Sequence, residues 1–440
     1  MHVSRTTGPG ACPRAALRGT PSDPRATRAG ACIGVLLVAL ACGGPDGPAA
    51  PSDASAPARA DAKPTASPQR RGLWVLAEGH QRVLEHPDRI PILVEDAGLL
   101  GATDLFVQVL RGGRAWFESS LADAGPYRAL VEAGGLDTLS ELLRQAHAAG
   151  LRVHAWVNVL SLARNREAPW LETLGADAVL VDKRGRSLLD YPNFDLPQPD
   201  RRYYRMGTPA LYLDPASPGV AELVAATFAE LLVRYPELDG LHLDYIRYPD
   251  VLPFVPGTRF GVGLDFGYGA ATRARFRNET GLEAPLGDST RNANRWDDWR
   301  REKLTGLVAS IAERGRTARP GVALSAAVWT WADRGYLALG QDWRRWLEDG
   351  LIDFAVPMAY TLDDRLLRYQ VERFAHLPVG GRIWIGLGTW LFAGQPERAL
   401  EQIRIARDGG AVAESLFSYD SIVATPALRD ALVREAAHAR

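Results

Sequence analysis

A single carboxylate ends an apolar run in the stretch DGLHLDYIRYP, residues 239–249. Asp244 is followed within a few residues by Arg247 and Tyr248. A carboxylate removed from water costs free energy unless it is paired, hydrogen-bonded or solvated. Asp244 therefore either performs acid, base or nucleophilic chemistry beside substrate-binding Arg247 and Tyr248, or forms an ion pair with Arg247 that holds the following loop. The place of Asp244 in the fold decides between these roles.

The alternation within this run indicates a strand with two different faces. Residues two positions apart share a face, so His242 and Asp244 point one way, whereas Leu241, Leu243 and Tyr245 point the other. When the apolar set packs against helices, His242 and Asp244 face the interior. We therefore expect the side chain of Tyr245 to point away from that of Asp244.

Eight short apolar runs, separated by helix-patterned segments such as 136–150, 217–236 and 297–320, predict an α/β fold. Strands that alternate with helices form a parallel sheet, because each crossover returns the chain to the same end. The count of eight favours a closed (β/α)8 TIM barrel over an open sheet. The predicted strands cover residues 72–77, 104–110, 151–158, 240–246, 322–329, 353–360, 383–388 and 413–419.

Two long insertions interrupt this alternation, residues 159–212 after the third strand and 250–290 after the fourth. Both follow the carboxyl ends of strands, where barrels of this kind keep their active sites. Asp244 lies at the same end, at the rim of the interior, and this position favours the functional role. Residues 70–440 form one barrel domain, and no second domain is needed.

The composition restricts the function classes. The chain has 440 residues, a formal charge of -1, 46% hydrophobic and 23% charged residues, which is ordinary for a globular protein. This balance predicts no nucleic-acid partner and no polybasic membrane patch. Cys12, Cys32 and Cys42 all precede the folded part, which excludes a disulfide framework, a thiol nucleophile and a cysteine metal site there. We expect no metal and no cofactor, since the histidines are also too sparse.

The N-terminus has the features of an export signal. Arg25 and Arg28 precede the apolar run 32–41, which is too short to span a bilayer. The run ends in small residues before Cys42, an arrangement that resembles the bacterial lipobox, in which the cysteine is lipidated. Residues 43–69 are rich in Pro, Ala and Ser and cannot bury enough surface to fold. We therefore predict a lipoprotein signal peptide over residues 1–42, a tether over 43–69, and anchoring in the bacterial envelope, at the periplasmic or surface side of the outer membrane.

Several motifs occur in the order typical of one family. They resemble the glycosyl hydrolase-like family 10 proteins from Arg71 to the last helix. The resemblance implies a barrel catalytic domain, a bacterial envelope location, often with a lipid anchor, and the cutting of cell-wall glycan strands. The motifs are RGLWV (71–75), AHAAGLRVHAWVN (146–158), LYLDPASPGV (211–220), LDGLHLDYIRYP (238–249), WDDWRRE (296–302), DWRRWLEDGLIDFAVPMAYT (342–361) and SLFSYDSI (415–422).

The sequence departs in one place from the pattern of the family that it resembles. After the second strand the family usually has an Arg and, a few residues later, an Asp, whereas this chain has Leu110 and Arg114, with Arg111 as the nearest substitute. The fourth strand is also distantly similar to the family 18 chitinases, whose pattern is D-G-x-D-x-D-x-E. Asp244 keeps the third Asp of that pattern, but Ile246 occupies the position of the catalytic Glu. Asp244 must itself act as the acid, base or nucleophile.

Hydrolysis of a glycosidic bond usually takes two carboxyl groups. Asp420, in the family-like motif FSYDS, is predicted as the partner of Asp244. Substrate assistance by an N-acetyl group would remove the need for a second carboxylate. The candidates near strand ends are Glu78, Glu118, Asp333, Asp364 and Asp420.

A sugar-binding site also needs flat apolar platforms and polar groups that fix orientation. Aromatic residues at or just past strand ends supply the first, and Asn158 at the end of the third strand supplies the second. His154 and His242 lie deeper, and we interpret them as hydrogen-bonded interior residues; Trp299 and Arg300 are interpreted as structural. The predicted substrate-binding residues are Asn158, Arg247, Tyr248, Trp329, Tyr360 and Trp390.

Three functions remain open. The favoured one is a glycoside hydrolase that cleaves a cell-envelope polysaccharide, with peptidoglycan glycan strands as the preferred substrate. The second is a non-catalytic glycan-binding lipoprotein built on an enzyme-like barrel, and the third is hydrolysis of a secreted or storage polysaccharide. Leu110 and Arg114 favour the binding protein, whereas Asp244 favours catalysis. The fold alone does not decide among them.

Overall fold

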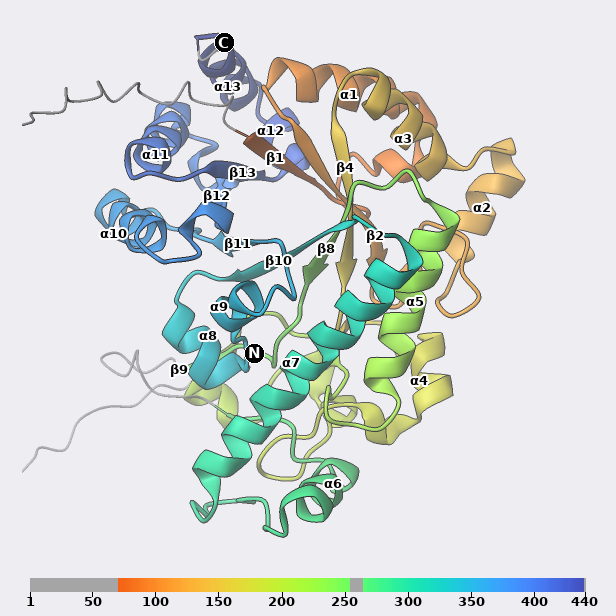
Figure 1. Ribbon diagram of the computed structural model, residues 1–440, viewed down its shortest axis with the longest axis vertical. Helices are drawn as coiled ribbons and strands as arrows, with labels where there is room; N and C mark the ends of the chain where they lie inside the picture. The colour runs from red at the N-terminus through yellow and green to blue at the C-terminus, as the bar shows by residue number, and fades with distance from the viewer. Residues whose placement is uncertain (1–69, 254–263, 439–440) are drawn as a thin grey trace, which may run out of the picture. The chain divides into compact units, whose positions relative to one another are not determined.

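The computed structural model describes residues 70–253 and 264–438 of the chain (Figure 1). The predicted signal peptide, the lipidation site Cys42 and the tether lie outside these residues. No helix in the two described ranges is long and apolar enough to cross a lipid bilayer.

Eight parallel strands close into a barrel, as Figure 1 shows from the side. The order around the barrel is β1-β13-β12-β11-β10-β8-β4-β2, and β1 pairs with both β13 and β2, which closes the ring. The predicted TIM barrel is confirmed, and each strand end lies within two residues of its predicted place. The strands are β1 (Arg70–Val75), β2 (Asp104–Arg111), β4 (Arg152–Asn158), β8 (Gly240–Asp244), β10 (Ala323–Trp329), β11 (Phe354–Met358), β12 (Ile385–Gly388) and β13 (Ala413–Phe417).

Helices surround the barrel and cover its apolar outer face (Figure 1). The predicted helix 136–150 forms α3, and Asp137 caps it by accepting a 3.0 Å hydrogen bond from the backbone N–H of Ser140. The helices are α1 (Ile90–Leu99), α2 (Gly125–Gly134), α3 (Thr138–Ala148), α4 (Pro169–Leu174), α5 (Val220–Arg234), α6 (Ala270–Thr280), α7 (Ala293–Ala318), α8 (Ala332–Leu339), α9 (Trp343–Glu348), α10 (Asp364–Ala375), α11 (Pro396–Asp408), α12 (Tyr419–Val423) and α13 (Pro426–His438).

The two predicted insertions are present and pair with each other. The first forms β5 (Ser161–Ala163), β6 (Tyr204–Met206) and β7 (Leu211–Tyr212), and the second begins with β9 (Val251–Pro253). β6 and β9 are antiparallel neighbours, and β5 pairs with β7. A further short strand, β3 (Arg114–Ala115), folds back on the end of β2. The insertions therefore form a joint wall over the carboxyl ends of β4 and β8.

The barrel interior is packed with aromatic rings. Trp74, Phe106, Trp156, Phe354 and Trp384 form one buried cluster, and the rings of Phe354 and Trp384 stack with centroids 4.4 Å apart. Such filling is usual for eight-stranded barrels, whose interior is a core and not a pore.

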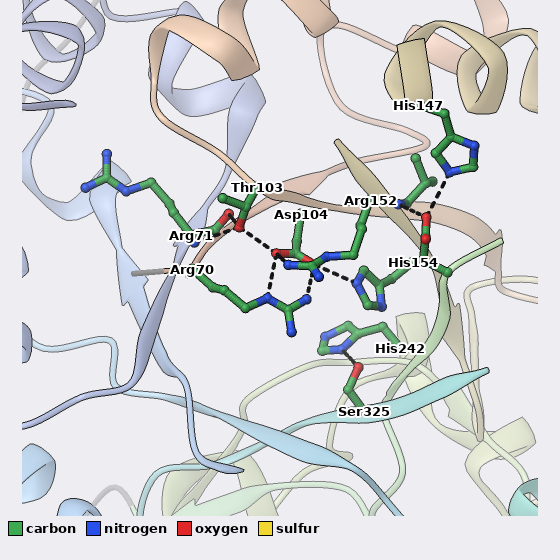
Figure 2. A network of polar contacts seen from close by, with 11 residues as sticks. Arg70, Arg71, Thr103, Asp104, His147, Arg152, His154, His242 and Ser325 are labelled. Carbon is green, nitrogen blue, oxygen red and sulfur yellow. Dashed lines mark hydrogen bonds and ion pairs between the residues drawn. The ribbon is translucent and has the colours of Figure 1, made fainter. Parts of the chain in front are cut away.

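A charged network closes the amino-terminal end of the barrel (Figure 2). Asp104, at the start of β2, is fully buried and accepts hydrogen bonds from Arg70 Nε (3.1 Å) and Arg152 Nε (3.0 Å), with His154 Nε2 at 2.9 Å. Burial alone would raise the pKa of Asp104, but the hydrogen bonds from His154 and Arg70 outweigh it and hold this pKa well below its usual range.

His242 lies one layer above this network, also in view in Figure 2. Its Nδ1 lies 2.8 Å from Ser325 Oγ, and its Nε2 accepts a 3.2 Å hydrogen bond from Trp74 Nε1. Burial lowers the pKa of His242 well below its ordinary value, so the ring is neutral. The expectation that His154 and His242 are hydrogen-bonded interior residues is confirmed.

Candidate active site

A cavity of about 480 Å³ opens at the carboxyl ends of the strands. Its walls come from the carboxyl-terminal residues of seven barrel strands and from the insertions. The lining residues are Trp74, Leu76, Glu78, Gln108, Arg111, Trp156, Asn158, Gly207, Thr208, Asp244, Tyr245, Arg247, Asp250, Ala327, Trp329, Met358, Tyr360 and Phe417.

Asp244 ends β8 and faces this cavity, as its alternation in the sequence predicts. Its Oδ2 accepts a 3.2 Å hydrogen bond from Trp156 Nε1, and its Oδ1 accepts one of 2.6 Å from the backbone N–H of Tyr245. Burial raises the pKa of Asp244, and Arg247 and these two hydrogen bonds offset only part of that effect. The site therefore holds a carboxyl group that keeps its proton to higher pH than an ordinary aspartic acid.

The prediction for Tyr245 is wrong. The strand ends at Asp244, and Tyr245 adopts a left-handed backbone conformation with φ of 52°. This turn ends the alternation of faces, so the ring of Tyr245 lines the cavity beside Asp244. A left-handed conformation is uncommon for a bulky residue, and it often occurs at functional sites.

Arg247 lies between two carboxylates of the cavity. Its Nη1 is 3.7 Å from Asp244 Oδ1. Burial raises the pKa of both Asp244 and Asp250, and the charge of Arg247 offsets part of that rise. The guanidinium stacks 4.7 Å from the ring centre of Tyr245. Within the described residues, Nε and Nη1 of Arg247 are buried without a hydrogen-bond partner, and so is Oδ1 of Asp250. The ion pair with Arg247 is thus present, and Arg247 also lines a cavity large enough for a ligand.

Asn158 occupies the position beside Asp244 in the barrel. The two residues are register partners on β4 and β8, so both side chains project to the same side. Asn158 Oδ1 accepts a 3.3 Å hydrogen bond from Gln108 Nε2, which fixes the orientation of the amide. The side-chain amide lines the cavity next to the catalytic candidate, in the place predicted for it.

Two of the three predicted aromatic platforms line the cavity. Trp329 at the end of β10 and Tyr360 just past β11 both do so. Trp390 does not: its ring packs edge-on against Tyr360, with centroids 4.8 Å apart, and is 37% exposed beside the cavity. Trp390 therefore supports the platform formed by Tyr360.

Glu78 is tied to the residues that depart from the family pattern. Arg111, at the end of β2, and Arg114, on β3, both form ion pairs with its carboxylate. Glu78, Arg111 and Asn158 also line a second cavity of about 750 Å³, which continues from the first toward the hairpin β2–β3 and the first insertion. The pair of cavities forms an extended groove across the barrel mouth.

Two predicted site residues lie elsewhere. Asp420, in the first turn of α12, is buried, accepts a 2.7 Å hydrogen bond from the backbone N–H of Gln81 and does not line the groove. Tyr248 is fully buried beneath the Arg300 guanidinium, 5.1 Å from its ring centre. The turn at Tyr245 directs Tyr248 toward α7 instead of the cavity, so neither residue is placed to contact a sugar there.

The remaining carboxylate candidates are ordinary surface groups. Glu118 pairs with Arg234, Asp333 with Arg344, and Asp364 with Arg398. Trp299 and Arg300 are buried on α7, and Arg300 binds Asp265 and Asp297, in keeping with a structural role.

In the part of the chain that the structure describes, no group of three or more His, Cys, Asp or Glu residues could hold a metal ion.

Sequence reasoning missed several lining residues. Trp156 lies two positions before Asn158, so the period-two rule alone places it on the same face. Asp250 and Thr208 belong to the insertions, whose course over the barrel has no signal in local sequence.

An elongated cavity with buried carboxyl groups and aromatic walls lies at the carboxyl end of a (β/α)8 barrel, the end at which barrels of this class keep their active sites. The chain belongs to the family described as Glycosyl hydrolase-like 10, whose model matches residues 69–387.

Relatives with curated names agree with this assignment. "Glycosyl hydrolase DigH" of Escherichia coli K12 is 26% identical over 324 residues, which cover 68% of this chain and 64% of the relative. "Glycosyl hydrolase YngK" of Bacillus subtilis is 23% identical over 310 residues, 67% of this chain and 51% of the relative. The chain thus matches less than two thirds of the length of either protein.

Solved structures share the fold at low sequence identity. The PgaB (BpsB) glycoside hydrolase domain from Bordetella bronchiseptica superimposes with a TM-score of 0.57 at 15% identity, covering 83% of this chain and 99% of that one. The catalytic domain of β-amylase from Paenibacillus polymyxa gives 0.52 at 13% identity, with 83% and 98% covered. These similarities concern the barrel alone.

Proposed function

We propose that this chain is a glycoside hydrolase that cleaves a cell-envelope polysaccharide, with peptidoglycan glycan strands as its substrate. The observation that carries the proposal is Asp244, a buried carboxyl group in the wall of the cavity whose pKa is raised by burial. A carboxyl group that retains its proton can donate it to the leaving glycosidic oxygen. Perturbed acids in a cleft of this kind are frequent at catalytic sites.

In the proposed reaction Asp244 donates its proton to the glycosidic oxygen as the bond from that oxygen to the anomeric carbon breaks. Water supplies the hydroxyl group that the anomeric carbon receives. A second carboxylate either activates that water or attacks the carbon first. Glu78 and Asp250 are the other carboxylates of the cavity, and they take the place of Asp420 as candidates.

The rest of the cavity suits a saccharide. Trp329, Tyr360 and Trp156 offer aromatic faces against which sugar rings can pack. Asn158 and Arg247 line the cavity and offer polar groups that can fix the orientation of a sugar. The continuous groove accommodates a chain of sugars, which favours a polymeric substrate.

The preference for peptidoglycan rests on the envelope association of the family and on the predicted lipid anchor. Lipidation at Cys42 and a tether over residues 43–69 would hold the barrel near the membrane, within reach of the cell wall. The proposed location is the bacterial cell envelope, on the periplasmic or surface side of the outer membrane.

A second candidate is a glycan-binding protein without catalysis. One observation favours it: Arg111 and Arg114 hold Glu78 in ion pairs at the position where the family usually has its own Arg and Asp. A carboxylate held by two arginines is less available to activate water, and the groove would then bind a glycan without cutting it.

The deciding experiment incubates the purified chain with peptidoglycan, both intact and stripped of peptides, and identifies released fragments by mass spectrometry. Release by the wild type but not by Asp244→Asn is the expected result. No release together with retained pull-down of the glycan would establish the binding protein, and neither release nor binding would move the substrate to another polysaccharide.

The second carboxylate is assigned with Glu78→Gln and Asp250→Asn. The variant that loses the base or nucleophile regains activity when azide is added, because azide attacks in place of the missing group. The configuration of the product reports the carboxyl separation, about 5–5.5 Å for retention and about 6.5–9.5 Å for inversion. If neither variant loses activity, the N-acetyl group of the substrate assists the reaction.

A further inference from the structure

A smaller cavity lies just over the rim of the barrel from the candidate active site. Its volume is about 120 Å³, and it is bounded by the segment after β10, by α9 and by α10. Trp329 lines the active-site cavity, whereas Thr330 and Trp331 line the smaller one. Two residues of extended chain span at most about 7 Å, so the two cavities are close neighbours. The lining residues are Thr330, Trp331, Ala332, Asp333, Arg344, Tyr369, Gln370, Arg373, Phe374 and Leu377.

Two exposed aromatic side chains stand at the mouth of this cavity. Trp331 precedes α8 and is 46% exposed, and Tyr369 on α10 is 54% exposed. They come from different elements of the fold, and both line the same small cavity. Exposed apolar side chains that gather around a hollow are a feature of ligand-binding grooves. Their flat faces are the surface that a pyranose ring packs against.

The interior of the cavity contains polar atoms without partners. Gln370 is only 4% exposed, and within the described residues its Oε1 has no hydrogen-bond partner. The hydroxyl oxygen of Thr330 is also buried and has no hydrogen-bond partner among the described residues. An unsatisfied buried polar atom costs about 1–3 kcal/mol, and such atoms are rare in native proteins. A ligand that hydrogen-bonds to both would remove this cost.

The remaining walls identify the group that fits. Phe374 and Leu377 provide an apolar surface in the cavity that Gln370 and Thr330 also line. The charged lining residues are Arg373 and the pair Asp333–Arg344, whose side chains bind each other. An acetamido group matches this set: its N–H donates to Gln370, its carbonyl accepts from Thr330, and its methyl packs on Phe374 and Leu377. Sites for whole drug-sized ligands have volumes of about 300–1,000 Å³, so this cavity takes one substituent, with the sugar ring outside it against Trp331 and Tyr369.

We propose that this cavity is a second saccharide-binding site, specific for an N-acetylated pyranose of a glycan chain that also occupies the active-site groove. The proposal rests on the proposed function, because it takes the substrate to be a polymer of N-acetylated sugars. The site holds one part of the glycan at the rim of the barrel near β10, while another part of the glycan lies in the groove. It favours long glycans over short ones without taking part in bond cleavage.

The test measures binding in the full chain carrying Asp244→Asn, so that no probe is cleaved. Isothermal titration calorimetry compares a chito-oligosaccharide, which is N-acetylated, with a cello-oligosaccharide of equal length, which is not. We expect two binding events for the first probe and loss of the rim event for the second. Added Gln370→Met should weaken the rim event about tenfold or more, and Trp331→Ala about fivefold.

Gln370→Met separates this role from a structural one. Replacing an unpaired buried amide with an apolar side chain of similar size leaves the melting temperature unchanged or raises it, so a loss of binding cannot be attributed to unfolding. The control is Tyr203→Ala, which removes an aromatic side chain that is 52% exposed and lines neither cavity. The control should bind both probes as its parent does.

Three results would overturn the proposal: a single binding event, a rim event of equal strength for both probes, or a rim event that Gln370→Met leaves unchanged. Hydrolysis is judged separately with the Asp244-containing chain. Glycan release with no Gln370-dependent binding would reject the second site and keep the hydrolase. Gln370-dependent binding with no release of any glycan would keep the site and reject the hydrolase.

Discussion

Each end of the barrel buries an aspartate, Asp104 at one end and Asp244 at the other, and the surroundings of the two carboxyl groups are opposite. Asp104 at the amino-terminal end is surrounded by Arg70, Arg152 and His154, and its pKa is held far below the ordinary value (Figure 2). Asp244 at the carboxyl end has one arginine at 3.7 Å and a pKa that burial raises. The carboxylate of Asp104 is therefore surrounded by cationic and hydrogen-bonding partners, whereas that of Asp244 has few.

The difference separates a stabilising site from a reactive one. The partners of Asp104 satisfy its charge, and Asp104 lines neither of the two cavities that form the groove. Around Asp244, two nitrogens of Arg247 and one oxygen of Asp250 have no hydrogen-bond partner among the described residues, and both residues line a cavity of about 480 Å³. Strain and unsatisfied groups are expected at functional sites and are compensated elsewhere in the fold.

The largest expected effect is on catalysis. Asp244→Asn keeps the shape of the side chain but removes the proton donor, and loss of a general acid typically lowers kcat about 10²–10⁴-fold. The melting temperature at pH 7 should stay the same or rise, because the variant no longer buries a carboxyl group. Initial rates of fragment release and a thermal scan check both statements. Activity within tenfold of the wild type would show that Asp244 is not the acid.

The opposite end should respond in stability and not in rate. Asp104→Asn removes the anion shared by Arg70, Arg152 and His154. Breaking a fully buried pair costs about 3–5 kcal/mol, but Arg70 and Arg152 reach solvent, so we expect about 2 kcal/mol. Urea unfolding at pH 7 measures the loss. Activity per folded molecule should be unchanged, and a fall in kcat without a fall in stability would contradict the contrast between the two ends.

The two aspartates should also act at opposite ends of the pH scale. The depressed pKa of Asp104 gives stability that is present above pH 4 or so and is lost as the pH falls through its folded pKa. The raised pKa of Asp244 gives stability that is present below about pH 4 and is lost as the pH rises through its folded pKa.

The stability gained by Asp244→Asn should therefore grow as the pH rises from 4 to 7, whereas the stability lost by Asp104→Asn should shrink as the pH falls below 4. Unfolding midpoints at several pH values test this. The kcat/KM of the wild type should decrease on the alkaline side as Asp244 loses its proton. If Glu78→Gln shifts the pH at which kcat/KM decreases on the alkaline side, the acid is Glu78 and not Asp244.

The barrel and the amino-terminal network illustrate what local sequence can predict. Eight apolar runs and their spacing sufficed for the strands, because a strand is set by short-range alternation and by the burial of its own residues. His242 and Asp244 were correctly placed on the inner face by the same rule. The rule of alternating faces fails at Tyr245, because this residue has a left-handed backbone conformation that ends the strand and changes the direction of the side chains after it.

The errors at the site all arise from contacts between distant segments. Tyr248 was misplaced because the turn at Tyr245 carries it toward Arg300, 52 positions later in the chain. Asp420 was favoured because it belongs to a family motif, yet its carboxylate is used to hold the backbone of Gln81. Asp250 was missed because the insertion that carries it lies across the cavity only through its pairing with β6. None of these contacts has a short-range signal.

The smallest expected effect is that of a substitution at Tyr248, which lies outside the cavity. Tyr248 is buried, and its hydroxyl has no hydrogen-bond partner among the described residues. Tyr248→Phe deletes that group, so the free energy of unfolding should stay within about 1 kcal/mol of the wild type or increase, and KM should not change. Tyr360→Ala, which removes a platform that lines the cavity, should raise KM several-fold under the same assay. Equal shifts in KM for the two variants would mean that Tyr248 reaches the substrate and that the cavity extends beneath Arg300.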